Sequence, residues 1–341
     1  SATWVGGDGN WLDAANWAVT GEPDKKGVLP DGNNVGLAVI EAGTVTSSQS
    51  LDYQGKTKLA GGTLSVGADT HLGASLPQVQ TDRITIDGGT LRIMSGFEMD
   101  ANRGIKLEGS GGTISVADGQ TLTYGGQISG TSLVKADAGT LVLTGANSFG
   151  GGLAVDDGMI RVGDGATAGS IADQAIVNNG NLVFDRTDVV AFAGAISGTG
   201  GVTQAGSGTL TLTGNNTFSG GVNLDAGILR LGSASAIGTA ATPGVIGFSG
   251  GRLQFTSDNT ADYSSRFAVT GQTFKIDTNG QDVAFATALA SPGGTLVKSG
   301  EGKLTLAVPT YDGATTINGG TLVIESDTGT LASSNYSGAG K

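Results

Sequence analysis

A short alternation of polar and apolar residues, introduced each time by a glycine, recurs along the chain. In each copy, two apolar residues stand two and four positions after the glycine, as in GTLTL at 208–212. This period of two is typical of a β-strand with one buried face, so we expect Leu210 and Leu212 to point inward and Thr211 to face solvent. No stretch of useful length shows the stripe of an amphipathic helix. The pattern predicts an all-β chain of short strands, with eleven copies that begin at Gly62, Gly89, Gly112, Gly139, Gly158, Gly180, Gly208, Gly227, Gly251, Gly302 and Gly320.

The spacing of these strands predicts how they stack. Leu141 and Ile160 are 19 residues apart, while Leu296 and Leu304 are 8 residues apart. Three intervals of the shorter kind nearly equal one interval of the longer kind. Three strands and their turns would therefore make one coil, which stacks on the next coil through parallel pairing. An antiparallel sandwich or barrel would favour two-residue Asn-Gly turns, which are few here. The pattern therefore predicts a three-sided parallel β-solenoid.

Composition agrees with this architecture. Glycine makes up 62 of 341 residues, far above the usual share of about 7%, and sharp corners require it. A flexible Gly/Ser linker is the alternative, but the apolar residues recur at fixed offsets from the glycines. Cysteine is absent, which excludes disulfides. The net charge of −12 argues against nucleic acid as the main partner.

Three longer stretches share a second motif. In 208–231 the sequence GTLTLTGNNTFSGGV is followed by DAGILRL, and 137–163 repeats this with Asn147 and Phe149 where the first has Asn216 and Phe218. A third stretch, 302–324, is weaker because it lacks the Gly-x-Asn turn. These stretches resemble the passenger-associated transport repeat of bacterial autotransporters. The N-terminal WVGGDGNWLDAANW at 4–17 is similar to the start of such surface proteins.

The resemblance implies a right-handed, three-sided parallel β-helix on the surface of a Gram-negative bacterium. We expect one passenger domain over 1–341, with a Trp-rich cap at 1–20 and related repeat units at 124–163, 192–232 and 285–324. The family's C-terminal membrane barrel is not in this sequence, so we expect a passenger fragment or a cleaved passenger. The implied role is that of an adhesin or stalk that attaches to host glycans or matrix, or that associates with a second copy.

Candidate chemistry is sparse. His71 is the single histidine, and we expect it on a surface loop because no nucleophile motif stands near it. The acidic residues Asp156, Asp157, Asp277 and Asp282 leave a glycan-active enzyme, a polysaccharide hydrolase or lyase, as the alternative. Asp157, however, precedes a glycine, where aspartate forms turns. The run GGDGN at 6–10 is similar to a calcium-binding repeat but occurs once, so we expect a turn. We therefore predict no catalytic, metal-binding or cofactor-binding residue.

The remaining conspicuous residues each have two interpretations. Trp4, Trp11 and Trp17 could form a carbohydrate-stacking platform, but we favour capping, since an open solenoid end exposes apolar core. Asn147 and Asn216 could bind a sugar, but we expect them at corners, bonded to backbone groups. Phe149 and Phe218 should then fill the core. Two breaks in the pattern, at 76–80 and 241–243, predict loops where binding residues would gather.

Overall fold

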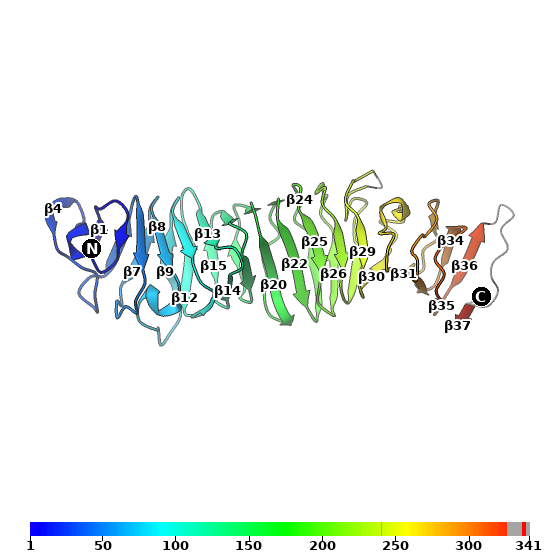
Figure 1. Cartoon of the computed structure of the whole chain (residues 1–341), viewed down its shortest axis with the longest axis horizontal. Helices are drawn as coiled ribbons and strands as arrows, with labels where there is room; N and C mark the ends of the chain where they lie inside the picture. Colours follow the sequence, from blue (N-terminus) through cyan, green and yellow to red (C-terminus); the bar gives the residue numbers. More distant parts are fainter. Residues whose placement is uncertain (240, 326–335, 339–341) are drawn as a thin grey trace. The chain divides into compact units, whose positions relative to one another are not determined.

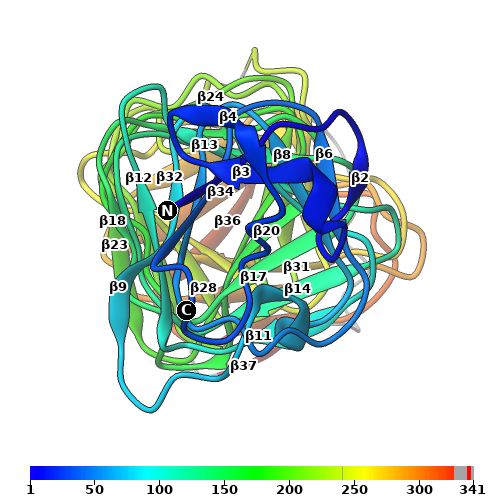
Figure 2. The same cartoon turned by 90° about the vertical axis from the view of Figure 1, so that its left-hand side faces the viewer.

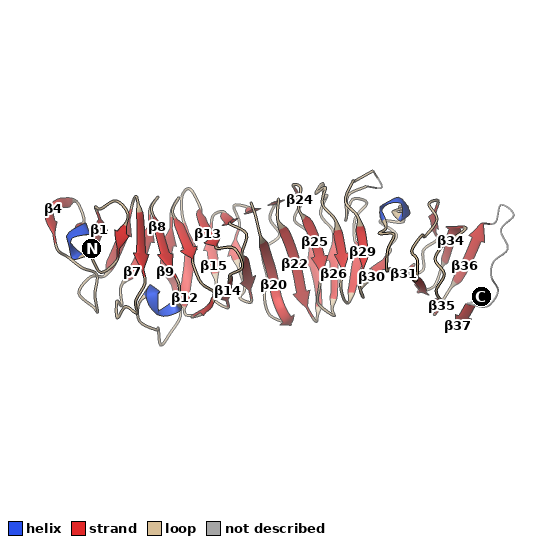
Figure 3. Ribbon diagram, viewed as in Figure 1, coloured by secondary structure: helices blue, strands red, loops and turns tan. Residues whose placement is uncertain are grey.

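The computed structural model describes residues 1–239, 241–325 and 336–338, and these residues form two compact units. The first unit comprises residues 1–164 and 168–180, and the second comprises 165–167 and the residues from 181 onward. Short strands dominate both units, as Figure 3 shows in red. No helix among the described residues is long and apolar enough to cross a bilayer.

The first unit holds the strands β1 to β21, except for the last two residues of β20, and two short 3-10 helices, η1 (Ala14–Asn16) and η2 (Asp69–Leu72) (Figure 1). The strands are β1 (Ala2–Trp4), β2 (Gly9–Asn10), β3 (Trp17–Val19), β4 (Glu22–Lys26), β5 (Leu37–Ile40), β6 (Thr44–Ser47), β7 (Lys56–Leu59), β8 (Thr63–Val66), β9 (Gln80–Ile86), β10 (Thr90–Ile93), β11 (Phe97–Met99), β12 (Arg103–Leu107), β13 (Gly112–Val116), β14 (Thr121–Tyr124), β15 (Ile128–Gly130), β16 (Leu133–Ala136), β17 (Thr140–Leu143), β18 (Ser148–Phe149), β19 (Leu153–Val155), β20 (Met159–Ala166) and β21 (Ile176–Asn178).

The second unit holds the later strands and the 3-10 helix η3 (Ser264–Arg266). The strands are β22 (Asn181–Arg186), β23 (Val189–Phe192), β24 (Ile196–Ser197), β25 (Gly201–Gln204), β26 (Thr209–Leu212), β27 (Val222–Leu224), β28 (Ile228–Leu231), β29 (Ile246–Phe248), β30 (Arg252–Gln254), β31 (Thr273–Asp277), β32 (Val283–Phe285), β33 (Thr295–Ser299), β34 (Lys303–Ala307), β35 (Thr315–Ile317), β36 (Thr321–Glu325) and β37 (Tyr336–Gly338).

In the first unit each regular coil contributes one strand to each of three sheets. Strands β12, β13 and β14 form one coil and lie on three different sides in Figure 2. The next coil repeats the order with β15, β16 and β17, each of which pairs in parallel with its counterpart one coil earlier. The three sheets run in the orders β18-β15-β12-β9-β7-β5-β1-β3-β4, β2-β6-β8-β10-β13-β16-β19-β21 and β11-β14-β17-β20.

The second unit uses the same parallel stacking, with sheets β22-β25-β27-β29, β23-β26-β28-β30-β31-β33-β35-β37 and β32-β34-β36. Its third side is partly formed by segments without strands, such as 213–221 between β26 and β27. The predicted all-β parallel β-solenoid is therefore confirmed.

In the core, the apolar side chains of successive coils stack on one another in register. In the first unit Leu64, Leu91 and Ile114 are buried partners on β8, β10 and β13. In the second unit Leu210 and Leu212 are buried, whereas Thr211 between them is half-buried. Each fully buried aliphatic side chain contributes about 1.5–3 kcal/mol relative to an exposed one. The predicted inward direction of the two leucines is confirmed.

Glycine is required where a corner passes close to the preceding coil. Gly130 ends β15 with φ of +104°, a backbone conformation that strains other residues. A Cβ atom at this position would also collide with the carbonyl oxygen of Leu107 in the coil before. The close approach of successive corners explains why glycines punctuate the strand pattern.

The N-terminal end of the first unit is closed by antiparallel strands and aromatic residues. Strand β1 pairs antiparallel with β3, and β3 pairs antiparallel with β4, whose sequence EPDKK is exposed throughout. Charges and proline on such an edge discourage pairing with another chain. Trp4, Trp11 and Trp17 are 3%, 1% and 0% exposed, and the ring centroids of Trp11 and Trp17 lie 4.8 Å apart. Each indole N–H donates to a backbone carbonyl. The burial of the rings leaves no indole face open to a sugar.

The buried tryptophans lead to a simple spectroscopic expectation. Because all three indoles are buried, acrylamide should quench the tryptophan fluorescence of the folded chain weakly, and added oligosaccharides should leave the emission unchanged. Acrylamide quenching in buffer and in 6 M guanidinium chloride measures this, with the unfolded chain as the reference for full access. Equal quenching constants in the two conditions would contradict the burial of the indoles.

Candidate functional site

Two asparagines occupy equivalent corners and connect three successive coils. In the first unit, Asn147 Oδ1 accepts a hydrogen bond from the N–H of Ile128 at 2.9 Å, and its Nδ2 donates to the carbonyl of Ser170 at 3.0 Å. In the second unit, Asn216 Oδ1 accepts from the N–H of Ile196 at 2.8 Å, and its Nδ2 donates to the carbonyl of Ala236 at 2.7 Å. Both side chains are buried, as are Phe149 and Phe218 beside them. The predicted corner and core roles of these four residues are confirmed.

A buried polar residue recurs at the same position of the repeated stretches, and the sequence pattern did not reveal its role. Lys135 points inward on β16, in register with Ile114 on one side and Val155 on the other. Its side chain is fully buried, and its Nζ donates to the carbonyls of Ala136 at 2.8 Å and Asp137 at 2.6 Å. The lysine therefore binds backbone oxygens of the turn that follows its own strand.

The equivalent positions in the second unit are Gln204 and Lys298. Gln204 Nε2 donates to the carbonyls of Gly206 at 2.7 Å and Gly208 at 3.2 Å. Lys298 Nζ donates to the carbonyl of Gly300 at 2.6 Å and, one coil further on, to that of Gly319 at 3.0 Å. A buried donor therefore binds the turn carbonyls in all three repeated stretches, which removes the cost of leaving them without partners.

Burial sets the protonation behaviour of these lysines. Desolvation lowers the pKa of Lys135 to about 8, and the carboxylates of Asp157 and Asp137 oppose that shift. Desolvation likewise lowers the pKa of Lys298, against the charges of Asp277 and Glu301. In both residues the folded state disfavours the charged ammonium relative to water.

The first unit should become more stable as the pH rises from about 8 towards 10. In this window the folded chain releases the Lys135 proton, while the unfolded chain keeps it up to a pKa of about 10.4. The unfolded state then binds more protons, so the free energy of unfolding rises with pH, by at most about 1.4 kcal/mol per pH unit. Urea unfolding followed by tryptophan fluorescence, which reports on the first unit, measures the slope.

The matched variants are Lys135→Met, which should flatten the slope, and Lys56→Gln, which removes an exposed lysine and should preserve it. Measurements should stop near pH 9.5 because burial raises the pKa of Tyr53, and a raised tyrosine pKa lowers stability above about pH 10. Equal slopes for wild type and Lys135→Met would contradict the assignment.

Buried arginines bind the backbone near the two stretches that interrupt the repeat pattern. Arg103, fully buried, pairs with Asp69 at 2.9 Å and donates to the carbonyl of Gly73 at 2.7 Å. In the second unit, Arg266 donates to the carbonyls of Ile237 at 2.6 Å and Gly244 at 2.8 Å. The expected loops at 76–80 and 241–243 thus stand beside anchored backbone, although Pro77 to Val79 and Pro243 are exposed.

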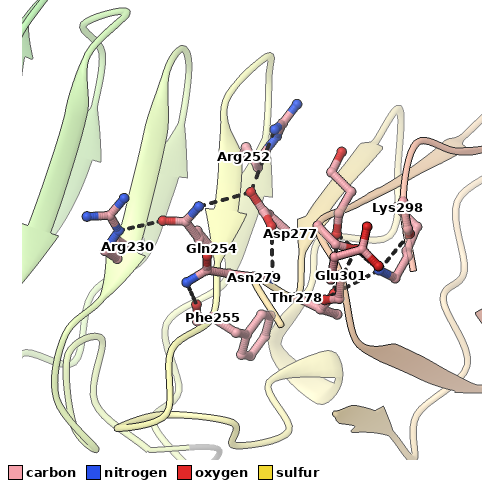
Figure 4. A network of polar contacts seen from close by, with 12 residues as sticks. Arg230, Arg252, Gln254, Phe255, Asp277, Thr278, Asn279, Lys298 and Glu301 are labelled. Carbon is pink, nitrogen blue, oxygen red and sulfur yellow. Dashed lines mark hydrogen bonds and ion pairs between the residues drawn. The ribbon is translucent and has the colours of Figure 1, made fainter. Parts of the chain in front are cut away.

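A polar network crosses the outward face of the second unit's largest sheet (Figure 4). Arg230, Gln254 and Asp277 are register partners on β28, β30 and β31. Gln254 accepts a hydrogen bond from Arg230 Nε through its Oε1, and its Nε2 donates to Asp277 Oδ2 at 3.0 Å. Asp277 also pairs with Arg252 at 3.7 Å and accepts from the N–H of Asn279 at 3.0 Å. Although they face outward, Gln254 and Asp277 are each only 7% exposed.

Comparison with known proteins identifies the repeats. The sequence model of the Passenger-associated-transport-repeat family matches residues 133–162, 202–231 and 296–324, which contain the buried donors Lys135, Gln204 and Lys298. Over 172 residues, half of this chain, the sequence is 36% identical to the protein named Adhesin BmaC autotransporter of Brucella suis biovar 1 (strain 1330). The chain carries passenger-associated transport repeats and is similar to an autotransporter adhesin. It aligns with 5% of the length of that relative, and no solved structure matches it.

The candidate catalytic residues have ordinary structural partners. His71 lies in η2, half-buried, and its Nδ1 accepts a hydrogen bond from the N–H of Gly67 at 3.2 Å. Asp157 accepts from the N–H of Gly158 at 2.7 Å, as expected of a turn, and Asp156 is exposed. Among the described residues no group of three or more His, Cys, Asp or Glu could hold a metal ion.

The remaining acidic candidates, Asp277 and Asp282, do not act as a pair. Asp277 belongs to the buried network, whereas Asp282 is exposed and lies 3.6 Å from Lys303. In the run at 6–10, Asp8 accepts from the N–H of Thr44 at 2.7 Å, so its carboxylate binds the first residue of β6. One Gly-x-Ser-x-Gly run, at 247–251, begins within β29 and ends in the turn before β30, so it is not a strand-to-helix elbow. The comparisons do not support the glycan-active enzyme alternative.

Proposed function

We propose that this passenger segment belongs to an adhesin and contributes binding surface outside a Gram-negative cell. The observation that carries the proposal is the 36% identity to a protein named as an autotransporter adhesin, over half of this chain. The role is attachment without turnover.

The structure is suited to display. Each unit points its apolar residues inward and leaves rows of polar side chains outside, at the strand spacing of about 4.8 Å. In the first unit Thr44, Thr63, Thr90 and Thr113 form one such row across β6, β8, β10 and β13, and all four are half-buried. Because the coil is maintained by the inward residues, the outward ones are free to vary with the ligand.

Attachment can be tested with the purified full chain coupled to beads. We expect coated beads to adhere to epithelial cells or to extracellular matrix more than beads coated with the unfolded chain, and two-colour bead mixtures to reveal self-association. Absence of adhesion to cells, to matrix and to other coated beads would overturn the proposal. Release of new reducing ends from a panel of polysaccharides would also overturn it, because it would show turnover.

A further inference from the structure

We propose that the outward face of β28, β30 and β31 binds a sulfated polysaccharide. We call this surface the basic face; it consists of Arg230, Arg252 and Lys275, with Gln254 and Asp277 beneath them. The inference rests on the proposed attachment function and names the class of ligand for one surface.

The three cations come from consecutive strands and gather on one side of the sheet. The register places Leu253 opposite Leu229 and Ile276, so Arg252 lies next to Lys275 and two residues along the strand from Gln254, on the same face. The three cationic side chains are all half-buried, which keeps their stems against the sheet and their charged ends accessible.

A buried relay orients Arg230. The carboxylate of Asp277 accepts from Gln254, and the amide oxygen of Gln254 accepts from Arg230 Nε. The Nε bond fixes one edge of the guanidinium, and Figure 4 shows its two terminal nitrogens turned away from Gln254. A guanidinium held in this way presents its terminal N–H groups as a preorganised fork, which suits an oxyanion.

The charge balance of this face also points to an anion. Among the outward side chains of β28, β30 and β31, three cations stand against one carboxylate, that of Asp277, which pairs with Arg252 at 3.7 Å. Lys275 Nζ binds a neutral group, the carbonyl of Gly250, at 2.7 Å. Several exposed cations elsewhere lie beside carboxylates, as Lys56 does at 2.6 Å from Asp82. The chain carries a net charge of −12, so the basic face is a local exception, and charges beyond roughly 8 Å are largely screened at physiological salt.

A sulfated polysaccharide fits this face better than a nucleic acid. Nucleic-acid binding depends on neutralising many phosphates along an extended basic stripe, and three cations do not make one. Sulfate groups carried on successive sugars can meet cations on successive strands. The half-buried hydroxyls of Thr209, Thr211 and Thr273 on the same sheet can bind the sugar hydroxyls between them.

Binding of the full chain to immobilised heparin tests the site. We expect retention at physiological salt, at least tenfold weaker binding for Arg230→Gln combined with Arg252→Gln, and an effect below twofold for Lys56→Gln combined with Lys106→Gln. The control pair loses the same charge from exposed lysines that lie beside carboxylates. Gln254→Leu keeps the net charge but frees Arg230, so it should weaken binding at least threefold if the relay matters. Melting temperatures verify that each variant is folded.

Four outcomes would overturn the inference. They are failure of the wild type to bind heparin, equal binding to desulfated heparin, equal losses in the control pair, and tighter binding to duplex DNA than to heparin. The bead assay separates the two proposals. Beads that adhere although the chain ignores heparin would refute this site alone, whereas heparin binding without bead adhesion would refute the attachment function and leave the site standing.

Discussion

Replacing Leu212 by aspartate should destabilise the second unit by about 4–5 kcal/mol, the range of the most damaging single substitutions. Leu212 is 0% exposed and lies in register between Phe192 and Leu231, which are both buried. A carboxylate at this position would have no cation in the apolar stack and would have to be protonated or drawn to the surface at the expense of packing.

The matched control lies one residue earlier on the same strand. Thr211 is half-buried, and its register partner on β28 is Arg230, so Thr211→Asp places a carboxylate beside a cation and should change stability by less than about 1 kcal/mol. Urea unfolding followed by circular dichroism near 218 nm, where strands absorb, compares the two variants. Similar unfolding midpoints would contradict the inward and outward assignment of β26.

Replacing Asn216 by alanine should cost about 2–4 kcal/mol. The substitution removes the acceptor for the N–H of Ile196 and the donor to the carbonyl of Ala236, and each buried group left without a partner costs about 1–3 kcal/mol. These two bonds reach the coils on either side, so their loss should weaken the stacking of three coils together.

Asn215, the residue before Asn216, provides the control. Because Asn215 is exposed, Asn215→Ala should change stability by less than about 0.5 kcal/mol. Asn216→Asp keeps the acceptor for Ile196 but places a carboxylate oxygen against the carbonyl of Ala236, so it should also destabilise. Differential scanning calorimetry gives the order directly. Equal melting temperatures for the Asn215 and Asn216 alanine variants would refute the corner role.

The repeated Lys135, Gln204 and Lys298 show where sequence reasoning stopped short. Their inward direction was available, because each stands two residues after an apolar strand residue, Leu133, Val202 or Leu296. A polar residue at an inward position in three related stretches, followed by a glycine-rich turn, is a usable signal for a buried cap. Its hydrogen-bond partners were not available, since they include carbonyls about 20 residues away, such as that of Gly319 for Lys298.

The sequence by itself determined the strands, the parallel coil, the inward leucines and the asparagine corners. These features depend on side-chain direction, which alternates strictly along a strand, and on glycine, which marks the turns. The tertiary structure alone decided which polar residues meet. Asp277 bonds to Gln254 rather than acting with Asp282, and Arg103 reaches back 34 residues to Asp69, because the stacking register depends on the length of every intervening loop. Register partners lie 27 residues apart at Leu64 and Leu91 but 19 apart at Leu141 and Ile160, so the local pattern does not give the number of residues that separates two partners.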